Sequence, residues 1–473
     1  MIYAIVLGVV VATLCGITAV KTFSVHTRSD FLVAGRKLPW TVLVFTLLSS
    51  WIGAGSLFAG AEKAYKEGFT ALWLAGGGWA GLIVIAAIAG RARRFAQFTV
   101  PDLLESRYNA AARVMATIAI VISYTVITSY QFKAGGDVLH LIFPELDRAT
   151  GMYIIAGFVI VFTAAAGMAS IAYLDVVIGG LVTLIVAISV PLLLSRAGGW
   201  SEVHRVLPES HFTLLGDGSL SKAAGTLLPT MLLLIGNQGM YQKFFSARSE
   251  RDAKIAVAGW IVGTVLLETL LVTFAVIGSS IFKTDSPREI IPLAARQGLP
   301  TLIGAILMGG IFAKVISTAN NYLFSPATNL MHDVYERFVN PNATERQSLI
   351  MSRVLVIALG IFALLQATQF QSILNAALYA YTVYGAAVTP AVMAVFFWKR
   401  ANTAGAVSSI ALGTIVTVAW NVAQGLGWKN DLDAVYPALI ASVASLVVVS
   451  LVTGQPEEAK WRPFFEKVTH EVG

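Results

Sequence analysis

The feature that most constrains this chain is a series of apolar stretches, each long enough to cross a lipid bilayer. A transmembrane helix needs about 20 predominantly apolar residues, and thirteen stretches meet this length. They cover residues 2–21, 40–61, 69–90, 112–136, 150–168, 172–195, 224–242, 255–282, 300–331, 350–368, 372–397, 403–423 and 435–453. We therefore expect an all-α polytopic membrane protein with about thirteen spans, built as a single transmembrane domain over residues 1–473.

The composition excludes several classes of protein. Hydrophobic residues make up 56% of the chain and charged residues only 12%. Soluble domains carry about 25% charged residues, so this chain lacks the charge to cover a water-facing surface. Cys15 is the single cysteine, and the six histidines form no metal-binding motif. We expect a protein of the lipid bilayer with no enzyme activity, no organic cofactor, no nucleic-acid binding and no obligate protein partner.

The distribution of positive charge predicts how the chain sits in the membrane. The first stretch lacks a preceding basic segment and a small-residue cleavage site, so we expect it to be retained as a span. With thirteen spans the two ends lie on opposite sides. About two-thirds of the 33 Lys and Arg residues then fall on the side of the C-terminus. Because cytoplasmic loops are enriched in these residues, we expect a cell-membrane (inner membrane) protein with its N-terminus outside and its C-terminus in the cytoplasm.

Two stretches carry glycine-rich interruptions near their middles. The second contains Leu48–Ser56 and the seventh contains Ile235–Gln242. Unpaired backbone groups are costly in hydrocarbon, so a broken helix at this depth is tolerated only around a cavity. The two stretches lie five spans apart, and a repeat of five spans must invert in the membrane. We expect two inverted repeats with broken helices 2 and 7, an arrangement typical of transporters. The repeats would cover 40–195 and 224–397, with 2–21 peripheral and 403–423 and 435–453 as extra spans.

The ninth stretch places polar side chains within apolar sequence. Ser317 and Thr318 are adjacent, and Asn320 and Asn321 lie one turn further on. Oxygen ligands of this kind suit a hard cation such as sodium. Hydroxyl side chains in membrane spans also bond to their own helix, so the pattern alone leaves both interpretations open.

Four ionisable residues lie within apolar stretches, where such groups are functional candidates by default. They are Asp175, Glu268, Lys133 and Lys314. In a structural alternative these two acids and two bases neutralise one another, and Lys133 has Asp137 four residues further on as a partner. Glu268 is flanked by leucines, so we expect it to face protein or to carry a proton. The sequence indicates no partner for it.

Several blocks of the chain resemble the sodium:solute symporter family. Asp30–Pro39 resembles the motif that precedes the family's second span, and Thr99–Tyr108 resembles its loop motif after the third. Asn237–Gln242 and Ser317–Tyr335 are also similar to family blocks, and all occur in the family's order over nearly the whole chain. The resemblance implies a LeuT-type fold with a 5+5 inverted repeat, and sodium as the coupling ion for an organic solute.

The resemblance also implies where sodium binds. The family's main site is matched here by the carbonyl oxygens of Ser49, Ile52 and Lys314 and by the hydroxyls of Ser317 and Thr318. Asp175 matches a nearby acid that belongs to a second sodium site in some members. Amides replace the family's hydroxyls at Asn320 and Asn321, which puts that second site in doubt.

Lys314 departs from the family, which usually has a small residue at this position. In one interpretation its ammonium pairs with Asp175 or Glu268 and sodium still binds. In the other the ammonium replaces the cation, and transport is proton-coupled or independent of cations. An ammonium about 4 Å from sodium is strongly repelled in a low-dielectric site. The hydroxyl pair nevertheless favours sodium, because it would otherwise have little reason to be there.

The expected substrate is a small organic solute. The family's sugar transporters use polar residues at the positions of Ser56, Ala75 and Gly78, so we do not expect a hexose. Trp51 lies in a stretch similar to the choline branch, where an indole faces a quaternary ammonium, although Trp51 is equally compatible with packing. The candidate pocket consists of Trp51, Gly53, Ser56, Gly78, Asn237, Tyr381 and Thr382. An amino-acid-like, carboxylate or amine solute fits these features.

Symport by alternating access is the function that these observations favour. A membrane solute sensor is the alternative from another class, because this fold is sometimes joined to signalling domains. The segment after Leu451 is short for that role. An intramembrane enzyme would need clustered carboxylates or a His/Cys group, and a channel would need a continuous polar stripe. The sequence indicates neither.

Overall fold

The computed structural model describes residues 1–22, 27–95, 97–165, 168–428, 430 and 432–466. Within this part of the chain, eleven helices are long and apolar enough to cross a membrane. Two further spans are interrupted helices, which brings the total to the predicted thirteen. The prediction of an all-α polytopic membrane protein is confirmed.

The uninterrupted spans are long helices, and several of them begin at residues whose side chains cap the helix. Asn109 and Ser249, for example, each accept a hydrogen bond from the backbone N–H three residues on, and two of the longest helices follow them. These caps extend the helices beyond their apolar centres. The uninterrupted spans are α1 (Ile2–Thr22), α5 (Leu72–Phe95), α7 (Ala110–Ile142), α8 (Arg148–Ala165), α9 (Met168–Arg196), α13 (Glu250–Ile281), α15 (Thr301–Asn329), α16 (Glu345–Ala367), α17 (Ile373–Phe397), α18 (Thr403–Gly425) and α19 (Val435–Val452).

The second span is broken where the sequence predicts. It consists of α3 (Trp40–Trp51), the π-helical turn η2 (Gly55–Ala59) and α4 (Gly60–Glu67). The backbone of Ile52 is extended, with φ −87° and ψ 100°, so α3 ends there. The side-chain oxygen of Gln131 on α7 accepts a hydrogen bond of 2.9 Å from the Ala54 N–H. This contact satisfies one of the backbone groups that the break releases.

The seventh span is broken at Asn237, between α11 (Leu220–Gly236) and α12 (Gln238–Ser246). The side chain of Asn237 accepts a hydrogen bond from the Met240 N–H and caps α12. Both broken helices are therefore present at the predicted positions. A backbone bridge between Leu38 and Ala247 also ties the approach to α3 to the end of α12.

Short helices connect the spans. In α6, for example, the Thr99 hydroxyl accepts a hydrogen bond from the Asp102 N–H and Pro101 lies in the first turn, both typical of a helix start. The short helices are α2 (Arg28–Val33), α6 (Val100–Arg107), α10 (Trp200–Val206), α14 (Ile290–Gly298) and α20 (Glu458–Phe465). The short 3-10 helices are η1 (Ala34–Arg36), η3 (Gly68–Ala71), η4 (Glu209–Phe212) and η5 (Pro287–Glu289). The segment η6 (Leu330–Val339) is a π-helix.

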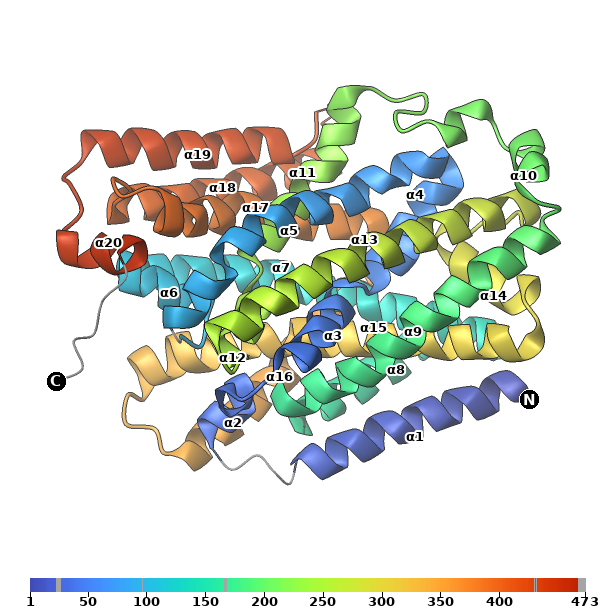
Figure 1. Cartoon of the computed structure of the whole chain (residues 1–473). Helices are drawn as coiled ribbons and strands as arrows, with labels where there is room; N and C mark the ends of the chain where they lie inside the picture. Colours follow the sequence, from blue (N-terminus) through green and yellow to red (C-terminus); the bar gives the residue numbers. More distant parts are fainter. Residues whose placement is uncertain (23–26, 96, 166–167, 429, 431, 467–473) are drawn as a thin grey trace.

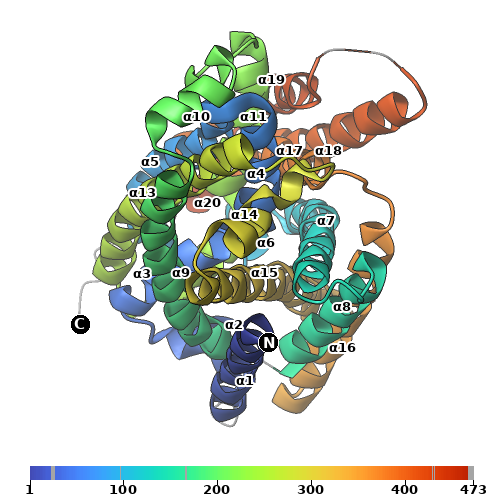
Figure 2. The same ribbon diagram turned by 90° about the vertical axis from the view of Figure 1, so that its right-hand side faces the viewer.

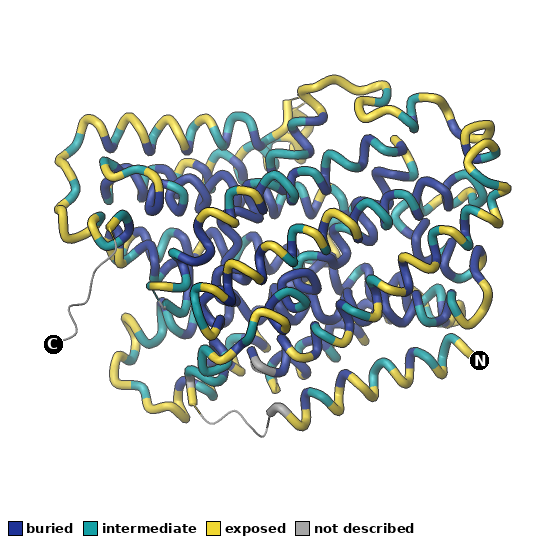
Figure 3. Tube along the Cα trace, in the orientation of Figure 1, coloured by how far each residue is buried: buried dark blue, intermediate teal, exposed yellow. Residues whose placement is uncertain are grey.

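The helices form one bundle with a buried interior and an apolar outside. α15 lies inside the bundle and α1 at its edge (Figure 2), and the burial of their residues differs accordingly. In Figure 3 the outer helices carry most of the exposed positions. Large apolar side chains such as Ile83, Val262 and Ile440 are exposed there, which is the pattern expected of a surface that faces lipid. α1 begins at one end of the bundle and α20 lies at the opposite end (Figure 1).

Glycine permits the close approach of α7 and α8. A Cβ atom at Gly136 on α7 would lie 2.7 Å from the backbone of Arg148 and 2.7 Å from that of Met152, both on α8. Gly151 on α8 faces Gly136 in turn, with a Cβ contact of 3.0 Å to its carbonyl oxygen. Such pairs of small residues let backbones meet in a membrane, where no hydrophobic effect drives helices together.

We predict that Gly136→Ala destabilises the protein by about 1–3 kcal/mol, because a methyl group there forces two backbones apart. The matched control is Gly157→Ala on α8, where a Cβ atom meets nothing within 4 Å. Thermal unfolding of the purified protein in detergent measures both. Equal melting temperatures for the two variants would contradict the prediction.

Candidate functional site

The break in span two faces the middle of α15, and oxygen atoms converge there. The hydroxyl of Thr318 lies 3.4 Å from the carbonyl oxygens of both Ser49 and Ile52. These carbonyls lie where α3 ends and lack the partners of a continuing helix. Gly53 permits the approach, since a Cβ atom there would lie 2.5 Å from Thr318 Oγ1. Three of the oxygens predicted to bind sodium therefore lie together.

Asp175 on α9 adjoins these oxygens and is fully buried. Its carboxylate accepts hydrogen bonds from Thr46 at 2.6 Å and from Ser50 at 3.3 Å. Ser317 on α15 also donates to it. The Ser317 hydroxyl is thus directed at Asp175, and the acid holds α3, α9 and α15 together beside the predicted ion site.

Two buried lysines lie beside this acid. The Nζ atom of Lys314 has no hydrogen-bond partner among the described residues. Lys243 on α12 donates to Ser50 Oγ at 2.5 Å and to Asn321 Oδ1 at 2.6 Å. Asp175 lies within electrostatic reach of both. The site thus joins one carboxylate to two amines.

Two assignments from the sequence change with these contacts. Lys243, the first residue after the apolar stretch 224–242, is buried, because α12 lies in the interior over its whole length. Lys133 donates to the carbonyl of Phe370, and Asp137 pairs with Arg288 at 2.8 Å. The alternative pair of Lys133 with Asp137 was therefore wrong, since a guanidinium occupies that carboxylate.

The amides expected near a second ion site are already engaged. Asn321 accepts from Lys243, and its side-chain nitrogen donates to the Ser317 carbonyl at 2.9 Å. Asn320 accepts from Thr163 at 2.8 Å. In this structure the Asn320 amide connects α15 to α8, and the Asn321 amide holds the Lys243 side chain.

A narrow pocket lies beside the break, on the side of α13. Trp51, Ser56 and Tyr381, three of the candidate pocket residues, line it together with Glu268. Glu268 accepts hydrogen bonds from Trp51 Nε1 at 3.1 Å, Ser56 Oγ at 3.1 Å and Trp79 Nε1 at 2.9 Å. The free volume is about 30 Å³, enough for one or two water molecules. A solute can bind only if the pocket widens.

Four other predicted pocket residues do not line this pocket. Gly53 contacts Thr318 as described, and Gly78 lies against the Trp51 ring, where a Cβ atom would approach to 3.0 Å. Asn237 accepts from Tyr124 and donates to Tyr322. Thr382 lines a separate cavity together with Asp433. Gly78 and Asn237 therefore support elements of the site, and Thr382 lies apart from it.

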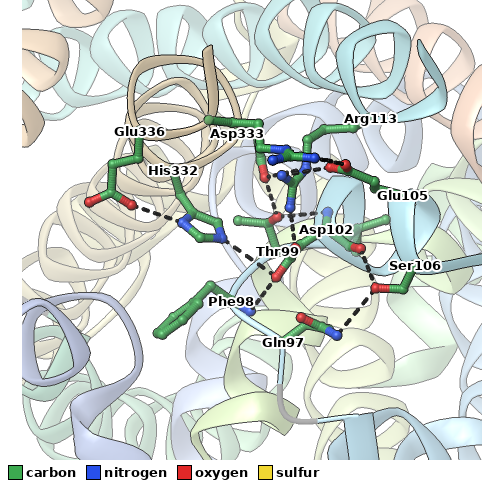
Figure 4. A network of polar contacts seen from close by, with 12 residues as sticks. Gln97, Phe98, Thr99, Asp102, Glu105, Ser106, Arg113, His332, Asp333 and Glu336 are labelled. Carbon is green, nitrogen blue, oxygen red and sulfur yellow. Dashed lines mark hydrogen bonds and ion pairs between the residues drawn. The ribbon is translucent and has the colours of Figure 1, made fainter. Parts of the chain in front are cut away.

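A cluster of ionisable residues closes one end of the bundle, next to α6 (Figure 4). Arg113 on α7 lies within ion-pairing distance of three carboxylates. These belong to Asp102, Glu105 and Asp333. His332 contacts Asp102 at 3.5 Å and Glu336 at 3.0 Å. The cluster links α6 and α7 to η6, which continues α15, so it holds these three elements together.

The cluster stabilises the ionised form of the Asp102 carboxyl group. Burial alone would raise the pKa of its carboxyl group, but the contacts with His332 and Arg113 outweigh burial and hold that pKa below the usual 3.8. A lowered pKa in the folded state means that the stabilisation is fully present above the pKa of the unfolded chain. It is lost as the pH falls through the folded-state pKa, so the contacts of the ionised Asp102 are intact at neutral pH.

Known proteins provide an independent comparison. The sequence profile of the sodium:solute symporter family matches residues 31–413. The osmoregulated proline transporter OpuE of Bacillus subtilis is 23% identical over 460 residues, which cover 92% of each chain. The high-affinity proline transporter PutP of Bacillus subtilis is 26% identical over 456 residues, with 91% of this chain and 94% of PutP covered.

Solved structures show the same fold. A Na⁺-coupled sialic acid symporter superposes with a TM-score of 0.83 at 16% identity, covering 97% of this chain and 98% of that one. The nucleobase-cation-symport-1 transporter Mhp1 superposes with a TM-score of 0.59 at 13% identity, covering 93% and 99%. The fold is therefore of the LeuT type. The chain belongs to the sodium:solute symporter family, a family of transporters and not of enzymes.

Several residues of the site carry no distinguishing mark in the sequence. Lys243 follows a span of ordinary length, and its neighbours Phe244 and Phe245 are the only hint that it lies in the interior. Trp79 lies among the glycines of α5. Gln131 lies in a polar segment of α7 with no motif around it. Their roles depend on which helices meet.

We predict that Arg113→Gln destabilises the protein by about 3–5 kcal/mol, because three carboxylates lose their shared cation in a buried setting. The Arg113 side chain is only 5% exposed. Arg94→Gln is the control, since it breaks an ion pair with Glu250 whose side chains are 36% and 41% exposed, worth about 0–1 kcal/mol. Denaturation of both purified variants tests this, and a similar loss in both would refute it.

Proposed function

We propose that this protein is a symporter that couples the movement of a small organic solute to sodium. Sodium would bind to the carbonyl oxygens of Ser49, Ile52 and Lys314 and to the hydroxyls of Ser317 and Thr318. The convergence of the Thr318 hydroxyl on two carbonyls of the α3 break is the observation that carries this proposal. Hydroxyl and carbonyl oxygens are the ligands that a dehydrated hard cation prefers.

The proposed mechanism is alternating access. Sodium would join α3 to α15, which belong to different repeats, and this bridge favours one state of the transporter. Rocking of the units 40–195 and 224–397 against each other then exposes the site to the other side. A single charge moving down 100 mV contributes about 2.3 kcal/mol. That energy drives accumulation of the solute even before the sodium concentration gradient is added.

A second candidate function is transport without sodium, in which lysine replaces the cation. The buried Lys314 amine, which has no hydrogen-bond partner in the part of the chain that the structure describes, favours it, as does Lys243 near Asp175. Two unit charges 4 Å apart repel by about 4 kcal/mol at an effective dielectric constant near 20. Two ammonium groups therefore oppose sodium, while Asp175 and the oxygens favour it.

We predict that Thr318→Val raises the sodium concentration for half-maximal uptake by about 10-fold, equivalent to losing about 1.4 kcal/mol of binding. Thr414→Val on α18 is the control, because its hydroxyl bonds only its own helix. Uptake of a panel of radiolabelled solutes, with L-proline first, into proteoliposomes gives the measurement.

Lys314→Met separates the two candidates in the same assay. If sodium binds, removing the amine leaves transport active and lowers the sodium concentration required. Uptake by the unmodified protein that is indifferent to sodium, together with inactivity of Lys314→Met, would reject sodium coupling in favour of the lysine.

The orientation is also a proposal, supported by the excess of Lys and Arg on one side of the membrane. We predict that a green fluorescent protein fused after the last residue fluoresces in bacterial cells, and that alkaline phosphatase fused there is inactive. The first reporter works only in the cytoplasm and the second only outside. The reverse pattern would place the N-terminus inside.

A further inference from the structure

Glu268 differs from the other buried acids because no base among the described residues pairs with it. It lies on α13 and is 4% exposed. Asp175 and Asp333 each lie near lysine or arginine. Glu268 forms no ion pair with any Lys, Arg or His of the described residues, and its partners are two indoles and one hydroxyl. A buried charge without a counter-charge is costly.

All the hydrogen-bond partners of Glu268 are neutral donors, so its carboxyl group can still pair with a cation. An indole N–H can only donate a hydrogen bond, and Trp51 and Trp79 donate to different oxygens of the carboxyl group. Both oxygens therefore act as acceptors. These neutral donors hold the carboxyl group in place without supplying a positive charge.

The carboxylate also lies where a solute would bind. Glu268 lines the pocket next to the α3 break together with Trp51, Ser56 and Tyr381. The remaining wall includes apolar side chains such as Leu271 and Val272. Aromatic rings attract cations through their faces, and this attraction adds to that of the carboxylate.

We propose that Glu268 binds a positively charged amino or ammonium group of the transported solute. This inference rests on the proposed function, because it names the cargo of that transporter. The solute supplies the counter-charge that the protein lacks. A simple carboxylate is repelled by Glu268, and a neutral hexose leaves the buried charge unpaired.

Thermal stabilisation of the purified protein tests the inference directly, because binding to the folded state raises the melting temperature. The probes are choline and L-proline as amine solutes, with propionate and D-glucose as anionic and neutral comparisons. All are measured at constant sodium and ionic strength. We expect at least one of the amine probes to stabilise the protein, and neither of the other two.

Glu268→Gln removes the charge while keeping the shape, and we expect it to raise the amine concentration required for half-maximal stabilisation at least 10-fold. Glu250→Gln is the matched control on the same helix, since that side chain is exposed and pairs with Arg94. If Glu268→Gln does not fold, Glu268→Asp keeps the charge. That variant should still select amines, with weaker binding.

Two outcomes would overturn the inference. One is stabilisation by propionate or glucose alone, and the other is undiminished amine binding by Glu268→Gln. The second outcome, combined with loss of pH-dependent uptake, would instead make Glu268 a proton carrier. Failure of the proposed function looks different, because uptake of a bound amine would then not respond to a sodium gradient.

Discussion

The last turn of α3 is the structural constraint on which the rest of the site depends. Its carbonyls at Ser49 and Ile52 face Thr318, its Ser50 hydroxyl contacts Asp175 and Lys243, and its Trp51 indole bonds Glu268. Backbone groups released by a break in the membrane need partners, and this break finds them on α7 and α15. One turn therefore connects the proposed ion site to the proposed solute pocket. A shift of this turn changes both sites together, which is the physical requirement for coupled transport.

The spans and the two breaks were predictable from the sequence because each follows from a local property. Apolar length defines a span, and glycine together with polar side chains marks a break. Gly53 shows why: its lack of a side chain is what allows Thr318 to approach the backbone. The convergence of Ser49, Ile52 and Thr318 came from the family resemblance, and their proximity agrees with it.

The remaining contacts depend on tertiary packing. Lys243 is buried because α12 is short and lies among other helices, which no local pattern encodes. Lys133 and Asp137 have the spacing of a helical pair, yet Arg288 reaches the carboxylate from another segment and displaces that pairing. The partners of Glu268 come from α3, η2 and α5. A single sequence indicates that such charges need partners, but the fold decides which ones they find.

The charges around the last turn of α3 suggest how ion and solute influence each other. Asp175 and Glu268 are acids, and Lys243 and Lys314 are bases, so these four groups sum to zero when all are ionised. The bases gather at the ion site, and Glu268 lies alone in the pocket. If an amine pairs with Glu268, it removes a negative charge that would otherwise help to attract sodium across the turn. Tight coupling then has to come from the geometry that both ligands share, and not from attraction between them, since two cations repel.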